Sequence, residues 1–247
     1  MNRKASNRRR IVTIIAAVAI LLMSASLTLV YAGNGDPGVV PPQSIVYGKS
    51  YADWSIAWFK WALSIPYSNN PIFDTTGANC GVGQSGPMWF LAGAYFGVKS
   101  LTRDCTIPAG KYVFFPLINV INDYPCPDPN FQPSPGQSLE DFLTNGNDIF
   151  WGARQYIDAV KTLKVTVDGN RLQNPFDYRA TSPMFIFKGD PSLTATFDPC
   201  ITGTPQHGVS DGYWVMLAPL SAGTHTLFFY ANGLWREDVT YHLTVTP

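Results

Sequence analysis

Large apolar residues recur at helical spacing in the segment between residues 51 and 65. Because they fall at intervals of four, three and four, they share one face of a helix. They are Trp54, Trp58, Trp61 and Ile65. Ser50 is suited to cap this helix with Asp53 at its third helical position, and Pro66 is suited to end it. We expect the aromatic face to pack on a sheet. A sugar platform and a membrane-seeking stripe are the alternatives.

Most other apolar runs are too short for helices and predict strands, because they are rich in aromatic and branched residues and bounded by Gly or Pro. The expected strands cover residues 88–92, 112–118, 183–188, 212–218, 224–230 and 239–246. In the last strand apolar residues alternate with threonines and a histidine, which predicts one buried and one solvent-facing side. Asp168-Gly169 predicts a hairpin turn within residues 164–172.

A second helical region is expected between the two groups of strands. A proline-dense loop, residues 125–137, precedes it. Ser138 starts a short helix, residues 145–147 interrupt it, and the helical pattern continues over residues 148–163. Together these elements predict a mainly β protein, a two-sheet β-sandwich of jelly-roll or Ig-like type with two inserted helices.

The N-terminal segment, residues 1–32, has the pattern of an export signal. Its first ten residues carry five Lys or Arg and no acid, and residues 11–32 carry no charge. Val30-Tyr31-Ala32 fits a signal-peptidase site, with cleavage before Gly33. The apolar run is also long enough, at roughly 20 residues, to span a bilayer. A cleaved signal and an uncleaved membrane anchor through residues 11–32 are therefore the two alternatives.

Either alternative leaves the rest of the chain outside, because the basic flank stays in the cytoplasm. We expect the protein to be secreted or held at the outer face of the cytoplasmic membrane. Residues 33–46 are rich in Gly and Pro and are expected to form a spacer. Residues 47–247 are expected to form a single domain.

The cysteines all follow the N-terminal segment. They are Cys80, Cys105, Cys126 and Cys200. An even number in an exported chain indicates disulfides, and the lack of a C-x-x-C pair argues against structural zinc. Of the three connectivities, we favour Cys80 with Cys105 and Cys126 with Cys200. The first bridge would tie together the entries of two predicted strands.

The charge balance argues against nucleic acid as a partner. The whole chain has 17 basic and 17 acidic residues, and five of the basic ones lie in residues 1–32. The exported part therefore has 12 basic residues against 17 acidic ones. Nucleic-acid binding depends on a basic face, which this part lacks.

Three motifs between residues 47 and 120 point to a family. They read Y-G-K-S-Y-x-D-W-x-x-x-W-x-x-W, D-T-T-G-x-x-C-x-x-G-Q-x-G-P-x-W-F-L-A-G and C-x-I-P-A-G-K-x-x-F-F-P-L-I-N. A looser match is S-D-G-Y-W-V-M-L-x-P-L-x-x-G-T-H-T-L near the C-terminus. By these motifs the chain resembles a group of uncharacterised secreted prokaryotic proteins. The resemblance implies export and a shared fold, and it transfers no catalytic residue.

The tests for a nucleophile or a zinc site mostly fail: Gly83-Gln84-Ser85-Gly86 is not the G-x-S-x-G elbow, and the three histidines have no H-E-x-x-H spacing. A triad of Ser210, His207 and Asp211 could assemble only in space. Glycoside hydrolysis needs two carboxyl groups several ångströms apart. The chain has two glutamates, and the aspartates near aromatic or Gly-rich segments are the other candidates, with no pairing readable. These aspartates are Asp53, Asp74, Asp123, Asp198 and Asp211.

Calcium is the one metal for which the sequence offers ligands. Asn122, Asp123 and Asp128 supply oxygen atoms, although their spacing is not that of a calcium loop. Turn capping by these residues is the expectation. No cofactor is otherwise expected.

Candidate binding residues come from aromatic side chains in less regular segments. Trp151 is one, and Trp235, which follows Asn232-Gly233 at an expected hairpin tip, is another candidate sugar or partner contact. Asp211 and His225 complete this set, with His225 expected to be a half-exposed packing residue.

The sequence thus predicts an exported binding or structural module at the cell surface or outside the cell, with a glycan or another surface protein as partner. A polysaccharide-active hydrolase or lyase with an aspartate pair is the alternative. A third hypothesis is a subunit of a surface layer or filament, assembled through an open sheet edge such as residues 239–246.

Overall fold

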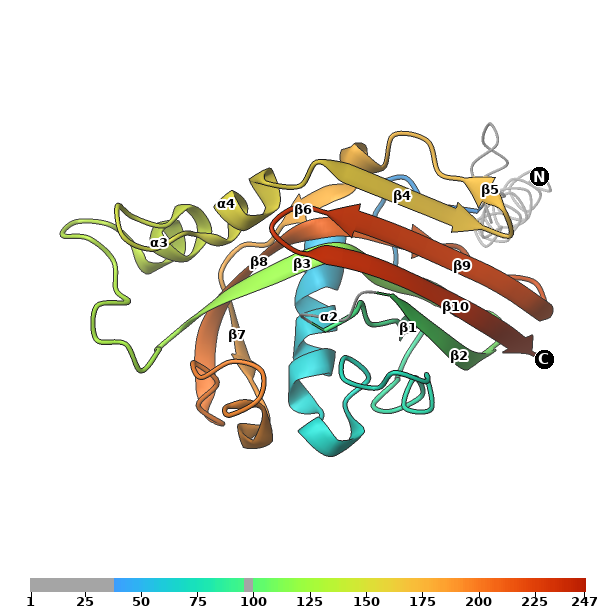
Figure 1. Cartoon of the computed structure of the whole chain (residues 1–247), viewed down its shortest axis with the longest axis horizontal. Helices are drawn as coiled ribbons and strands as arrows, with labels where there is room; N and C mark the ends of the chain where they lie inside the picture. The colour runs from blue at the N-terminus through green and yellow to red at the C-terminus, as the bar shows by residue number, and fades with distance from the viewer. Residues whose placement is uncertain (1–37, 96–99) are drawn as a thin grey trace, which may run out of the picture. The chain divides into compact units, whose positions relative to one another are not determined.

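The computed structural model describes residues 38–95 and 100–247, so the expected signal or anchor lies outside the described residues. The described chain is mainly β, with two five-stranded sheets packed on one another (Figure 1). One sheet contains β1 (Met88–Phe90), β3 (Tyr112–Tyr124), β6 (Arg179–Thr181), β7 (Phe185–Lys188) and β8 (Pro205–Leu217). The other contains β2 (Leu101–Pro108), β4 (Thr162–Val167), β5 (Asn170–Arg171), β9 (Gly223–Asn232) and β10 (Arg236–Thr246). The predicted two-sheet β-sandwich is confirmed.

The first sheet is built on the long antiparallel pair of β3 and β8. Its order is β1-β3-β8-β6, with β7 also paired to β8. The other sheet has the order β2-β10-β9-β4-β5. Phe115 of β3 and Phe229 of β9 meet between the sheets, with ring centroids 5.2 Å apart. The apolar positions of β10 are buried and its threonines face outward, as its alternation predicts.

The prediction that residues 239–246 form an open edge is wrong. Strand β10 lies between β9 and β2, and β2 pairs with it in parallel from Leu101 opposite Val239 to Pro108 opposite Thr246. Strand β2 was not predicted. Its inward positions include Arg103, which is 2% exposed, so a buried cation interrupts the apolar alternation that would have marked a strand.

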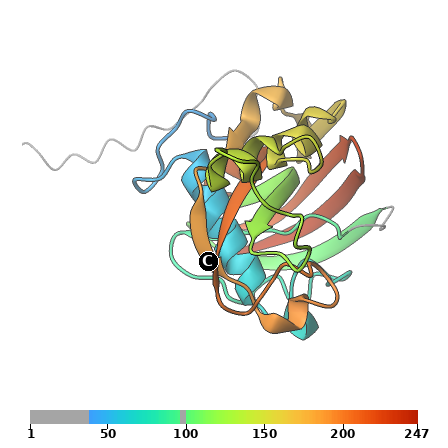
Figure 2. The ribbon, with the colours of Figure 1, turned by 90° about the vertical axis from the view of Figure 1, so that its left-hand side faces the viewer.

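Helix α2 (Tyr51–Ser64) lies against the first sheet (Figure 2), and its aromatic residues contact β8. The Ser50 hydroxyl accepts a hydrogen bond from the backbone amide of Asp53, whose carboxylate accepts one from the amide of Ser50. The expected capping box is therefore confirmed. Trp58 lies 5.6 Å from Trp214 of β8, between ring centroids. Because the helix tryptophans are buried, the sugar platform and the membrane stripe are wrong for this face.

The second helical region is shorter than predicted. It contains α3 (Leu139–Asn145) and α4 (Ala153–Asp158), and residues 159–163 leave the helix because β4 already begins at Thr162. The predicted hairpin follows: Asp168 and Gly169 have φ values of 51° and 79°, as a two-residue turn requires. Three short 3₁₀ helices complete the described elements. They are η1 (Tyr67–Asn69), η2 (Pro175–Tyr178) and η3 (Pro191–Leu193).

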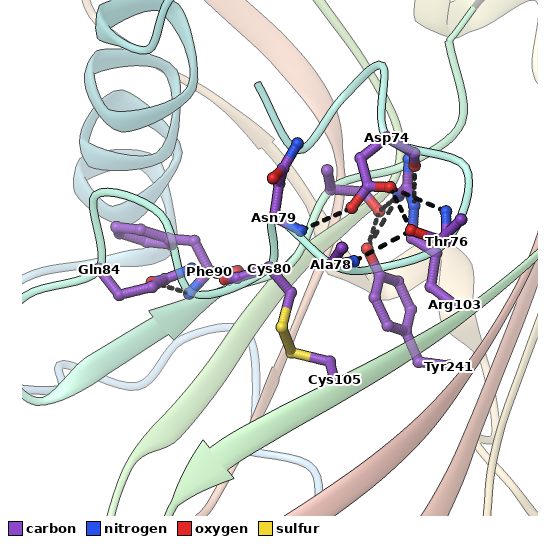
Figure 3. The surroundings of a disulfide bond; sticks show 11 residues. Asp74, Thr76, Ala78, Asn79, Cys80, Gln84, Phe90, Arg103, Cys105 and Tyr241 are labelled. Atoms are coloured by element: carbon purple, nitrogen blue, oxygen red, sulfur yellow. Dashed lines mark hydrogen bonds between the residues drawn. A yellow bond between two sulfur atoms is a disulfide. The ribbon is translucent and has the colours of Figure 1, made fainter. Parts of the chain in front are cut away.

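Both predicted disulfides are present, Cys80–Cys105 and Cys126–Cys200. Figure 3 shows the first, which joins the loop after Asp74 to strand β2. Disulfides persist in oxidising surroundings, so they indicate an extracellular or periplasmic location. None of the helices in the described part of the chain combines the length and the apolar character needed to cross a membrane.

The described part of the Gly/Pro-rich segment lies against the sandwich. Val39 is buried and forms an isolated bridge with Leu217 of β8. The carbonyl oxygen of Val40 accepts a hydrogen bond of 2.6 Å from the Tyr51 hydroxyl. Residues 38–46 therefore contact both β8 and α2.

Candidate functional site

The site lies along the outer edge of β3. Strand β1 pairs with β3 only from Tyr112 to Phe114, whereas β8 pairs with its other edge as far as Tyr124. Beyond Phe114, no strand in the described residues covers the outer edge. A cavity of about 600 Å³ borders this edge at residues 119–122. Side chains alternate between the two faces of a strand, so four consecutive residues can line the cavity only if it wraps around the edge.

Six of the sixteen residues that line the cavity are aromatic. They come from α2, the loop after β1, α4, the loop before the second disulfide and the β9–β10 turn. They are Trp58, Phe59, Tyr95, Tyr156, Phe197 and Trp235. Leu234 also lines the cavity and is 52% exposed, which places it at the rim. Four polar side chains reach the same space, namely Asn119, Asn122, Asp198 and Glu237.

Glu237 is the most deeply buried of these polar groups, at 5% exposure. Its Oε2 accepts a hydrogen bond of 2.6 Å from the backbone amide of Ala94. Burial raises the pKa of Glu237 to about 8, although hydrogen bonds from Ala94 and Trp235 and the charge of Arg103 act in the opposite direction. At neutral pH the carboxyl group therefore holds its proton and can donate as well as accept a hydrogen bond.

Arg103 is close enough to this carboxyl group for its charge to act on the pKa of Glu237, and its guanidinium is engaged by the protein. It donates to Tyr241 Oη, which Figure 3 draws beside it, and to four backbone carbonyl oxygens. Those carbonyls belong to Ile72, Asp74, Ala92 and Gly93. The guanidinium thereby fixes the loop that presents the Ala94 amide to Glu237.

Asp123 and Asp198 form a carboxyl pair near the second disulfide, and Asp198 also lines the cavity. Asp123 Oδ2 accepts a hydrogen bond of 2.6 Å from Gln206 Nε2, and Asp198 Oδ1 accepts one of 2.8 Å from the backbone amide of Cys200. Burial raises the pKa of Asp123 to about 8, helped by the charge of Asp198 and the hydrogen bond between the two carboxyl groups. Burial also raises the pKa of Asp198. We infer that this pair shares a proton at neutral pH.

This carboxyl pair offers too few ligands for a metal ion. The Sγ of Cys200 lies within 4.8 Å of both carboxyl groups, but it belongs to the disulfide and is not a thiolate. Only two carboxyl donors are then left, and calcium takes six to eight oxygen ligands. Of the other suggested calcium ligands, Asn122 donates to the Trp151 carbonyl and Asp128 accepts from the amide of Asn130.

Asn119 adds an unsatisfied donor. Its Nδ2 is buried and has no hydrogen-bond partner among the described residues. Leaving such a donor unpaired costs about 1–3 kcal/mol. Asn119 lines the cavity, but its Nδ2 has no accessible surface there, so this donor is not available to a bound molecule.

The proposed triad does not assemble. The Ser210 hydroxyl lies 2.9 Å from the Ser55 hydroxyl, toward α2. The next residue, Asp211, points to the other face of β8, and its carboxylate forms an ion pair with Arg179 at 2.6 Å. Asp211, a candidate binding residue, is fully buried in this ion pair.

Of the remaining candidate binding residues, only Trp235 lines the cavity. Trp151 is 46% exposed, and its ring packs on Tyr156, at a centroid distance of 5.3 Å. His225 is half-buried, and its Nδ1 lies 2.7 Å from an Asp168 carboxylate oxygen. The structure therefore does not bring these three residues together.

At the sequence level Glu237 was counted only as one of the two glutamates, although a signal for its burial was present. The buried alternation of β10, from Val239 through Tyr241 to Val245, extends two residues back to Glu237. That register places a carboxyl group on the inward side of the strand. Asn119 and Tyr156 had no comparable signal, because their approach to the cavity depends on contacts between distant segments.

Comparison with known proteins gives little further guidance. Neither a family model nor a curated protein matches the sequence. One similar solved structure is the cysteine protease inhibitor EhICP2 from Entamoeba histolytica, at 12% identity and a TM-score of 0.22. The match covers 64% of this chain and 96% of that chain. A likeness of this size supports no inference about fold or function.

Proposed function

We propose that this protein is an exported binding protein that takes a small organic ligand into the cavity beside β3. The observation that carries the proposal is one cavity of about 600 Å³ in which six aromatic and four polar side chains converge. Ligand sites typically have this size and this mixture of apolar wall and few polar groups. The N-terminal pattern, the resemblance to secreted proteins and the two disulfides support action outside the cytoplasm.

A role in surface-layer assembly has less support. That hypothesis relied on an open edge at residues 239–246, and both neighbours of this strand are in place. The outward side of β10, with its threonines, also lacks the aromatic residues that a flat binding face would need.

The test is a ligand screen on the full-length chain, expressed in a secreting host and purified in oxidised form. A panel of amines, sugars and small carboxylic acids is screened by thermal shift, since a ligand that binds only the folded state raises the melting temperature. Val120→Phe fills the cavity from β3, and Thr240→Phe makes a matched change on the outward side of β10.

Compounds that stabilise the wild type and Thr240→Phe but not Val120→Phe support the proposal. A panel without hits, or hits that Val120→Phe leaves unchanged, would contradict it. If Val120→Phe melts at a much lower temperature than the wild type, Trp235→Leu replaces it as the cavity variant.

A hydrolase or lyase acting on polysaccharides is the second candidate. Asp198 and Glu237 both line the cavity, and the pKa of each is raised, as a general acid requires. The contact between Asp123 and Asp198 is too close for a retaining pair, which needs about 5 Å between its carboxyl groups. An enzyme would therefore use Asp198 with Glu237. Release of sugar ends from polysaccharides, lost in both Asp198→Asn and Glu237→Gln, would support this reading.

A further inference from the structure

We infer that the cavity binds an organic cation: an ammonium group, primary or quaternary, carried on a compact body. This inference rests on the proposed function and names its ligand class. It follows from the signs of the charges that face the cavity and from the nature of the walls.

The ionisable side chains of acidic character in the lining are the carboxyl groups of Asp198 and Glu237. No Lys, Arg or His belongs to the described lining. Within the described lining, an anionic ligand would therefore meet carboxyl groups and no cation, because the guanidinium of Arg103 lies outside the lining and is engaged by the protein. A positively charged ligand would meet two carboxyl groups that become negatively charged when they lose their protons.

The aromatic walls favour the same class. A cation over an aromatic ring is attracted by the negative face of the ring, most strongly by tryptophan and most of all where water is excluded. Trp58 and Trp235 are both in the lining, and four further rings surround the same space. A neutral sugar could also stack on these rings, but it would gain nothing from the charge of the carboxyl groups.

The state of Glu237 agrees with this assignment. Burial keeps its carboxyl group protonated at neutral pH, even though Arg103 lies near enough to favour the ionised form. A cation placed in the cavity would add a second positive charge close to the carboxyl group. Ionisation of Glu237 would then be favoured, and the ligand would gain an ion pair in surroundings of low polarity.

Choline and its neutral isostere 3,3-dimethylbutan-1-ol test the inference, because they have nearly the same shape and one hydroxyl group and differ in charge. Binding of each to the full-length oxidised protein is measured by isothermal titration calorimetry at pH 7. We expect choline to bind at least about tenfold more tightly, as a desolvated cation–π site implies. Glucose serves as the sugar probe and is expected to bind more weakly than choline.

Glu237→Gln keeps the shape of the side chain and removes the ionisable group. It is expected to weaken choline binding at least about tenfold and to leave the affinity for the isostere unchanged. Glu140→Gln is the matched control, because Glu140 is the other glutamate of the chain and lies on α3, where its Oε1 accepts from the amide of Met184. It is expected to change neither affinity. If Glu237→Gln does not fold, Asp198→Asn takes its place, with the same expected loss for choline.

The outcomes separate the inference from the proposed function. Equal binding of choline and the isostere would overturn the inference of a cationic ligand, and so would binding of glucose alone. If Val120→Phe abolishes that binding, the proposed binding cavity still stands. An unchanged choline affinity in both carboxyl variants would also overturn the cation. Failure of all three probes, together with a silent ligand panel, would overturn both.

Discussion

Glu237 accepts a hydrogen bond of 2.6 Å from the backbone amide of Ala94, a residue 143 positions earlier in the chain. This contact joins the start of β10 to the loop that follows β1. Arg103 fixes the same loop from β2 by binding the carbonyl oxygens of Ala92 and Gly93. Two strands of one sheet therefore shape a cavity that lies beside a strand of the other.

The buried carboxyl group of Glu237 should make stability depend on pH. Its pKa is about 8 in the folded protein, against an ordinary value of 4.5. Between these values the folded state binds more protons than the unfolded state, so stability falls as pH rises through this window. Glu237→Gln lacks this loss. Its melting temperature relative to the wild type should therefore rise by about 2 °C or more between pH 6 and pH 9.

The same difference should be absent from Glu140→Gln, measured in parallel by calorimetry at several pH values. The Asp123–Asp198 pair titrates in both proteins and cancels in the comparison. A constant offset between Glu237→Gln and the wild type at all pH values would show that Glu237 is ionised in the folded state.

Gly93 leaves little room for a side chain. A Cβ at this position would lie 3.1 Å from Glu237 Oε2, so that oxygen would have to move by a few tenths of an ångström while it is held by the Ala94 amide. We expect Gly93→Ala to destabilise the protein by about 1–3 kcal/mol, as crowding of a packed site does. Gly81→Ala is the control, since its Cβ would meet nothing closer than 4.0 Å. Equal urea midpoints for the two variants would contradict the close packing around Glu237.

Arg103 should not be replaceable by lysine. Its guanidinium serves five acceptors, and an ammonium group has three donors, so at least two buried acceptors would lose their bonds. Arg103→Lys is expected to cost about 2–4 kcal/mol. The exposed Arg171, changed to Lys in the same way, should be neutral. Chemical denaturation measures both, and a neutral Arg103→Lys would mean that this network contributes little.

The Cys80–Cys105 bridge should stabilise the sandwich mainly through the unfolded state. It spans 25 residues, and a loop of this length corresponds to about 3 kcal/mol in the chain-entropy model. Replacing both cysteines by serine should lower the urea midpoint accordingly and leave the circular dichroism spectrum mainly β. A double variant as stable as the wild type would contradict this stabilisation.

Local signals in the sequence were sufficient for several elements of this fold. The capping pair of Ser50 and Asp53 defined the start of α2, the Asp168-Gly169 turn defined a hairpin, and alternation defined β10. Each of these signals is carried by residues close together in the chain. The favoured disulfide pairing was also confirmed: Cys80–Cys105 lies within the first half of the chain, and Cys126–Cys200 links the two halves.

The predictions that failed concern elements whose structure depends on contacts between segments far apart in the sequence. Strand β2 was not recognised because Arg103 occupies an inward position, where only its partners on other segments make a cation acceptable. The helix expected over residues 148–163 gives way after Asp158, where pairing of β4 with β9 determines the structure. The pairing of Asp123 with Asp198 could not be read either, since 75 positions of chain separate residues that only the fold brings together.

The most direct test of the cavity as a binding site is the titration of choline into the full-length oxidised wild type and Val120→Phe, side by side. We predict saturable heat with the wild type and none with the variant, at matched melting temperatures. Saturable heat of the same size and affinity in both proteins would place binding elsewhere and contradict the proposed site.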